Sequence, residues 1–187
     1  MVYLKRVAPL LLVTLLPAIA HTATIGGTDY ATQYDYSEFF AATDGKKFRV
    51  VLAGNPFPGV NQRAVAISLL AQMQAARPQP HLAFTYDDSF ERPRPDYRLV
   101  LLFDASKDFG AMAVCAGTQP RLGNGKPGLF NVFAVYCRND LALSQTTAWT
   151  NAAGPDDPRV EQLFRELFAV LFSDAAGLRP RSGAGLR

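Results

Sequence analysis

The residues of this chain best suited to metal chemistry are its two histidines, His21 and His81. If the chain is cleaved just before His21, that residue offers its α-amine and its imidazole to one metal ion, and a second imidazole completes a copper site. Against this, His81 follows Pro80 at the start of an expected strand, where a solvated or hydrogen-bonded histidine is commoner. We therefore expect no cofactor, with copper bound by His21 and His81 as the alternative.

Residues 1–20 have the pattern of a secretory signal peptide. A basic pair is followed by an apolar run too short to span a bilayer, and then by the small residues Ala18 and Ala20. The pattern predicts cleavage after Ala20; cleavage after Ala23 and a retained N-terminal anchor are the alternatives. No cysteine follows the apolar run, so a lipid anchor is not expected. We expect a periplasmic or secreted protein without a stable transmembrane segment after cleavage.

Cys115 and Cys137 are the two cysteines of the chain. An oxidising compartment favours a disulfide between them, which would close a loop of about 23 residues and contribute on the order of 3 kcal/mol through chain entropy. Two buried free thiols are the alternative. A metal site at these positions would need further ligands, in which the sequence is poor.

One loop is well placed to bind a ligand, because it joins an expected central strand to a helix. It consists of Gly54, Asn55, Pro56 and Phe57. Phe57, between two prolines, either stands exposed as a contact residue or packs down against the helix as a hydrophobic staple.

Arg98 and Arg138 are charged positions within otherwise apolar strands. They either pair with Asp104 or Asp140 on a solvated face of the sheet, or mark a surface that binds a partner. Together with the loop at residues 54–57, these arginines complete the candidate binding residues.

Catalytic motifs receive little support. Residues 123–128 match G-x-G-x-x-G, but a strand is expected to follow them, whereas a dinucleotide site needs a helix there. The sequence contains no G-x-S-x-G. The acidic group Asp87, Asp88 and Glu91 could be a carboxylate pair or a weak calcium loop, but a solvated turn is the commoner reading. The sequence leaves enzymatic activity open and favours a non-catalytic protein.

Charge argues against nucleic acid as a partner. The formal net charge is +3, and without the basic pair of the signal segment 17 basic residues face 16 acidic ones. A nearly neutral protein has little electrostatic attraction for a polyanion.

Hydrophobic periodicity predicts an α+β protein. Alternating or continuous apolar runs predict strands at residues 48–53, 81–86, 97–104, 129–137 and 141–149, with a further short strand at 111–116. Two helices are expected, one after Asn61 and one after Asp157, while residues 37–43 form a short helix or a loop. We predict a two-layer sandwich in which a mostly antiparallel sheet of about five strands carries two helices on one face. The expected order is signal peptide 1–20, lead-in arm 21–47, a single domain 48–175 and a disordered tail 176–187.

The mature chain resembles uncharacterised exported proteins of proteobacteria over roughly residues 48–172. The resemblance is carried by Gly54-Asn55-Pro56-Phe57, Phe84-Thr85, Tyr97-Arg98-Leu99-Val100, Cys115 and Tyr136-Cys137-Arg138. Many such relatives are lipoproteins, and this chain departs from them because it lacks the lipidated cysteine. The resemblance implies an envelope location and a disulfide; it implies no activity.

Three functional hypotheses follow. The first is a non-catalytic envelope module that binds another envelope protein or a small ligand. The second is a copper-binding or redox protein that uses His21 and His81. The third is a structural accessory to outer-membrane assembly.

Overall fold

A six-stranded sheet in the order β1-β6-β5-β4-β2-β3 organises the protein. The computed structural model describes residues 23–88, 95–123 and 125–175. The strands are β1 (Thr24–Tyr30), β2 (Lys47–Ala53), β3 (Ala83–Thr85), β4 (Tyr97–Phe103), β5 (Leu129–Arg138) and β6 (Leu141–Asn151). The helices are α1 (Tyr36–Thr43), α2 (Gln62–Ala75), α3 (Ala111–Cys115) and α4 (Pro158–Leu171).

The sheet is mixed. Strand β2 runs parallel to both β3 and β4, whereas β4, β5, β6 and β1 pair antiparallel in that order. The predicted α+β class is confirmed, but the sheet has six strands and includes a parallel part. Strands β2 and β3 can run parallel because α2 connects them and returns the chain to the starting end of β2.

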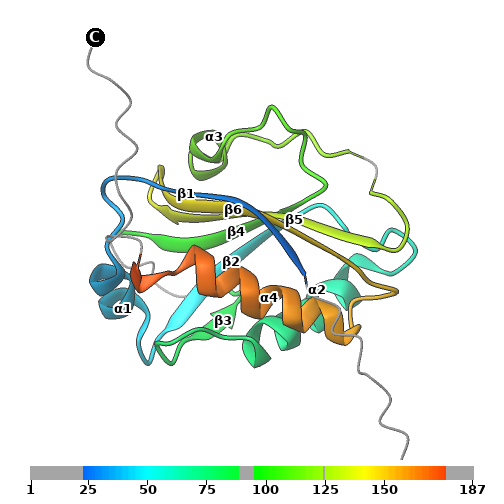
Figure 1. Cartoon of the computed structure of the whole chain (residues 1–187), viewed down its shortest axis with the longest axis horizontal. Helices are drawn as coiled ribbons and strands as arrows, with labels where there is room; N and C mark the ends of the chain where they lie inside the picture. Colours follow the sequence, from blue (N-terminus) through cyan, green and yellow to red (C-terminus); the bar gives the residue numbers. More distant parts are fainter. Residues whose placement is uncertain (1–22, 89–94, 124, 176–187) are drawn as a thin grey trace, which may run out of the picture.

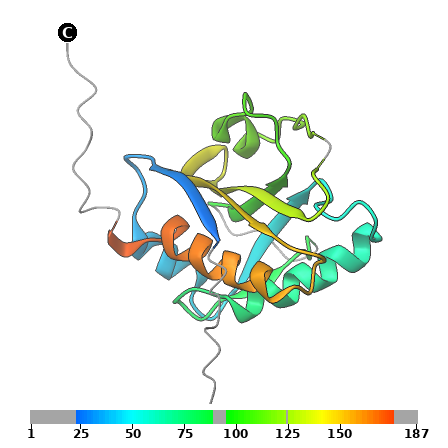
Figure 2. The same cartoon turned by 45° about the vertical axis from the view of Figure 1, so that its right-hand side comes forward.

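Helices α2 and α4 lie on one face of the sheet, as predicted, while α3 lies on the opposite face (Figures 1 and 2). Strand β5 shows how the two faces are divided. Its even-numbered residues, from Phe130 to Tyr136, belong to the large core beneath α2 and α4. Val135 and Cys137 belong to a smaller cluster beneath α3. Both faces of the sheet therefore carry apolar side chains.

Local sequence explains the two long helices. Asp157 caps α4 by accepting a hydrogen bond from the backbone N–H of Arg159, and Pro158 occupies the first turn, where its missing N–H costs nothing. The apolar side of α4 is completely buried. Asn61 caps α2 in the same way, through the N–H groups of Arg63 and Ala64.

Two segments differ from the sequence-based expectation. Residues 111–116, predicted as a short strand, form helix α3 instead. The buried residues Ala111, Val114 and Cys115 follow the helical spacing i, i+3, i+4. In so short an apolar run, the sequence alone does not distinguish a helix from a strand. Within the segment expected to be a lead-in arm, residues 24–30 form the edge strand β1 and pair with β6. Residues 37–43 are helical, within α1.

The predicted signal peptide 1–20 and tail 176–187 lie outside the described residues. Within the described part of the chain, no helix combines the length and the apolar composition needed to cross a membrane.

Candidate functional site

The loop after β2 is held together by its own hydrogen bonds. Asn55 accepts a hydrogen bond from the N–H of Phe57 at 2.9 Å and donates one to the carbonyl of Val60 at 3.0 Å. Gly54 has a φ of +90°, and a Cβ there would lie 2.9 Å from the carbonyl oxygen of Phe103, so only glycine fits.

The ring of Phe57 is 8% exposed and lies 5.7 Å from the ring of Phe130, centroid to centroid. Phe57 therefore packs into the core and does not offer its ring as a surface contact. Pro56 beside it is also buried. Ligand binding by the loop of residues 54–57 stays a prediction.

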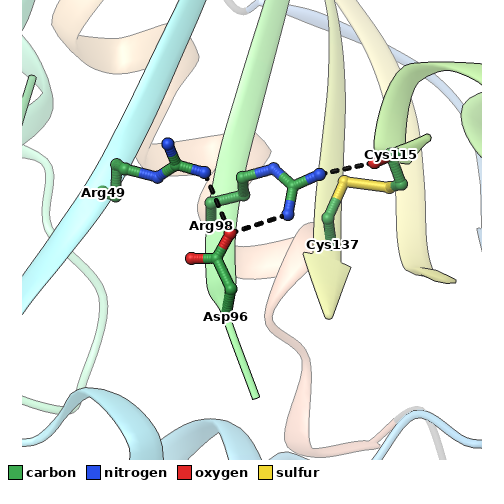
Figure 3. The surroundings of a disulfide bond; sticks show 5 residues. All are labelled: Arg49, Asp96, Arg98, Cys115 and Cys137. Atoms are coloured by element: carbon green, nitrogen blue, oxygen red, sulfur yellow. Dashed lines mark hydrogen bonds and ion pairs between the residues drawn. A yellow bond between two sulfur atoms is a disulfide. The ribbon is translucent and has the colours of Figure 1, made fainter. Parts of the chain in front are cut away.

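Arg98 lies in a partly buried network beside the disulfide (Figure 3). Arg49 and Arg98 each donate to the same oxygen of Asp96 at 3.0 Å, and Arg49 also donates to Asp88 at 2.9 Å. The second terminal nitrogen of Arg98 donates to the carbonyl of Cys115. The two guanidinium groups thus face two carboxylates, and Arg98 ties β4 to the end of α3.

The disulfide itself joins α3 to β5. Cys115 and Cys137 are bonded, with their Cα atoms 5.6 Å apart, and both side chains are buried. This bond and the hydrogen bond from Arg98 fix the chain between β4 and β5 over the second face of the sheet.

Arg138, the last residue of β5, follows Cys137 and forms a separate cluster. Its Nη1 donates to both carboxylate oxygens of Glu38 at 2.8 Å, and the hydroxyl of Tyr97 donates to the same carboxylate. Burial and the hydrogen bond with Glu38 raise the pKa of Tyr97 to about 12. The expected partners of the two arginines were thus wrong: Arg98 pairs with Asp96, and Arg138 pairs with Glu38.

His81 is exposed in the turn before β3, where its backbone N–H binds Asp44 and its carbonyl accepts from Gly45. His21 lies outside the described residues, so a copper site formed by both histidines stays a prediction. Within residues 23–88, 95–123 and 125–175, no three His, Cys, Asp or Glu side chains cluster closely enough to hold a metal ion.

The structure also contains a groove on the second face of the sheet, which the sequence did not indicate. It has a volume of about 590 Å³ and lies between strands β1, β6 and β5 and the segment of residues 105–110. Further along β5, α3 covers this face and buries Val135 and Cys137. The groove therefore occupies the part of the face that α3 leaves open.

The floor of the groove comes from alternate residues of neighbouring strands. Asn131 of β5 lies opposite Trp149 of β6, and Phe133 lies opposite Thr147. On the other side of β6, Gln145 lies opposite Asp29 of β1 and donates a hydrogen bond to its carboxylate at 3.1 Å. Apolar rings and planar polar groups therefore share one surface.

The segment of residues 105–110 forms the overhanging wall. It contributes Ser106, Lys107 and the half-buried ring of Phe109. Ala105 bridges to Leu122, and the N–H of Ser106 donates to the carbonyl of Arg121, which hold this wall to the following loop. Of the charged side chains that line the groove, Asp29 is acidic and Lys107 is basic, so their formal charges cancel.

The sequence analysis did not select these groove residues, because it identified their strands from the apolar residues alone. One signal was available: the single tryptophan of the chain, Trp149, stands in an outward-facing position of a strand. In the structure its side chain is 39% exposed.

The fold and its groove define an α+β protein with one disulfide and a mixed sheet that is open on part of one face. No family model matches the chain, and no curated protein matches it. Among solved structures, a dodecamer of a PelC variant from Paraburkholderia phytofirmans is similar, with 10% sequence identity and a TM-score of 0.40. That similarity covers 80% of this chain and 98% of the other, and at so low a TM-score it carries no argument about fold or function.

Proposed function

We propose that this chain is an exported envelope protein, periplasmic or secreted, that binds a small ligand or another envelope protein without catalysing a reaction. Residues 1–20 support export, because a basic pair, an apolar run and Ala18 and Ala20 follow the order that signal peptidase requires. The disulfide between Cys115 and Cys137 fits the same proposal, because such bonds persist in oxidising compartments.

The groove on the second face of the sheet is the observation that carries the binding role. Its volume of about 590 Å³ falls in the range of small-molecule sites, roughly 300–1,000 Å³. Ligand sites combine apolar walls with a few placed polar groups, and this groove does so with Trp149, Phe133, Asn131 and Gln145. The wall is held to the following loop by the Ala105–Leu122 bridge and the hydrogen bond from Ser106 to Arg121, and a groove held in shape in this way needs less ordering when a ligand binds.

A native mass measurement tests this proposal. The protein is recovered from the cells that produce it, and its intact mass is compared before and after unfolding. We expect an added mass that is released on unfolding.

A variant separates the groove from other surfaces. Gln145→Arg keeps a hydrogen-bond donor for Asp29 but extends a charged side chain into the groove, and it should be recovered without the added mass. The control is Ile67→Arg on α2, whose side chain is 64% exposed and lies outside the groove. Retention of the added mass by Gln145→Arg would place the ligand elsewhere.

Copper binding by His21 and His81 is the second candidate. It is favoured by the exposure of His81, whose backbone is held by Asp44 and Gly45 while its ring faces solvent. The same mass measurement decides it. Copper bound to a chain that begins at His21, and lost in His81→Ala, would make the protein a metalloprotein.

A further inference from the structure

The chemistry of the groove defines a class of ligand more narrowly than its size does. Its aromatic surface comes from Trp149 and Phe133 on the floor and Phe109 on the wall. An aromatic ring attracts the apolar face of a ligand through its large contact area and the negative potential of its π-system. A ligand for this groove therefore needs at least one flat apolar face.

The polar side chains of the groove add a second requirement. Asn131 and Gln145 each carry an amide that can donate and accept, Thr147 carries a hydroxyl that can do both, and Asp29 accepts. A purely apolar ligand would cover these groups without replacing the hydrogen bonds that they make to water, at a cost for each of them. The ligand must therefore both donate and accept hydrogen bonds around its edge.

Charge supplies the third requirement. Asp29 and Lys107 both line the groove, so an anion attracted by Lys107 is repelled by Asp29, and a cation attracted by Asp29 is repelled by Lys107. Asp29 is already hydrogen-bonded to Gln145. The groove thus favours a ligand with no net charge.

We propose that the groove binds a neutral saccharide. A pyranose ring has an apolar C–H face that stacks on an aromatic ring, and its rim of hydroxyl groups both donates and accepts hydrogen bonds, as the three requirements demand. The groove has room for a short oligosaccharide, because its volume of about 590 Å³ exceeds that of a single sugar ring. This inference rests on the binding role proposed above.

Trp149 makes the test direct, because it is the single tryptophan of the chain and lies in the groove. Its fluorescence is titrated with maltotriose, cellotriose and chitotriose, and with phenylacetate and phenethylamine as charged aromatic probes. We expect a saturable change with at least one trisaccharide, with an affinity that does not depend on salt, and no saturable change with the charged probes.

Binding to variants is measured by calorimetry, because the variants at Trp149 lack the fluorescent tryptophan. Trp149→Ala should weaken trisaccharide binding at least tenfold, Trp149→Phe should restore much of it because a ring remains, and Ile67→Ala on α2 should bind like the wild type. Circular dichroism checks that each variant is folded.

The outcomes separate the two proposals. Saturable binding of a charged probe in the groove, with none by the trisaccharides, would overturn the saccharide proposal and leave the binding role standing. Unchanged trisaccharide affinity in Trp149→Ala would overturn the assignment of the site. Absence of binding by every probe, together with no added mass in the native measurement, would overturn both.

Discussion

Removal of the disulfide should lower the free energy of unfolding by about 3 kcal/mol. The bond joins residues separated by 22 positions, and the chain-entropy relation gives about 3 kcal/mol for a loop of that length. The perturbation is the double variant Cys115→Ala/Cys137→Ala. Alanine is chosen because both side chains are buried among apolar neighbours, where serine would add an unpaired hydroxyl.

Urea denaturation followed by circular dichroism measures this change. Because the cross-link restricts the unfolded chain, its removal should also steepen the dependence of the unfolding free energy on urea. In thermal unfolding, a loss of about 3 kcal/mol corresponds to a fall in Tm of roughly 6–12 °C for a domain of this size. Wild-type protein in a reducing buffer supplies the comparison and should match the double variant.

A loss below about 1 kcal/mol would refute this reasoning, because it would mean that the reduced chain keeps α3 in place without the cross-link. So small a loss would be explained by Arg98, because its guanidinium binds the carbonyl of Cys115 whether or not the disulfide is present. A triple variant that also carries Arg98→Ala would then show the loss that the double variant does not.

Three further predictions concern the fold, each measured by urea denaturation. Phe57→Ala should cost about 3–5 kcal/mol if the ring fills the core as the structure shows, and less than 1 kcal/mol if the ring stands exposed. Tyr136→Phe should be neutral or stabilise by about 1 kcal/mol, since the buried hydroxyl of Tyr136 has no hydrogen-bond partner among the residues that the structure describes; a clear loss would reveal a partner. Asp157→Ala should cost about 1 kcal/mol at pH 7 through the lost helix cap. The hydrogen bond from Arg159 holds the pKa of Asp157 far below its usual value, so this contribution is present above the unfolded pKa of about 3.9 and should shrink as the pH falls from 5 to 2; a difference that is constant with pH would contradict it.

Elements with strong local signals could be predicted from the sequence. Helix α4 has an N-cap, a first-turn proline and a complete apolar stripe, and the long strands β4 and β5 have apolar runs bounded by turns. Their positions depend on periodicity and capping, which are local properties of the chain. The α+β class follows from their order.

Strand β1 and helix α3 lacked such signals. Residues 24–30 are half-buried and mostly polar, and they become a strand because β6 offers an edge to pair with. Gly26 belongs to this close pairing, since a Cβ there would lie 2.1 Å from the hydroxyl of Thr147. The secondary structure of β1 and of α3 therefore depends on tertiary contacts, which the local sequence does not show.

The candidate site was harder to predict than the fold. Arg98 was recognised as a charged residue in an apolar strand. Its partner Asp96 could not be chosen over Asp104 without the pairing of β2 with β4, which places Arg49 beside Arg98 so that both bind Asp96. The groove could not be predicted because it combines residues of β1, β5 and β6 with the separate segment of residues 105–110. Its residues share no local pattern.

Helix α3 covers only part of the second face of the sheet, so we expect residues under α3 to matter for stability and residues of the open part to matter for ligand binding. Beneath α3 the face is closed, and Val135 and Cys137 are fully buried, whereas Trp149 beyond the cover keeps 39% of its side chain exposed. Because Trp149 lies outside both apolar clusters and is only partly covered, Trp149→Ala should lower the free energy of unfolding by no more than about 2 kcal/mol. The same substitution should abolish most ligand binding. If instead Trp149→Ala destabilised the protein by several kcal/mol, the ring would be a packing residue of the sheet, and the groove would lose its main argument as a binding site.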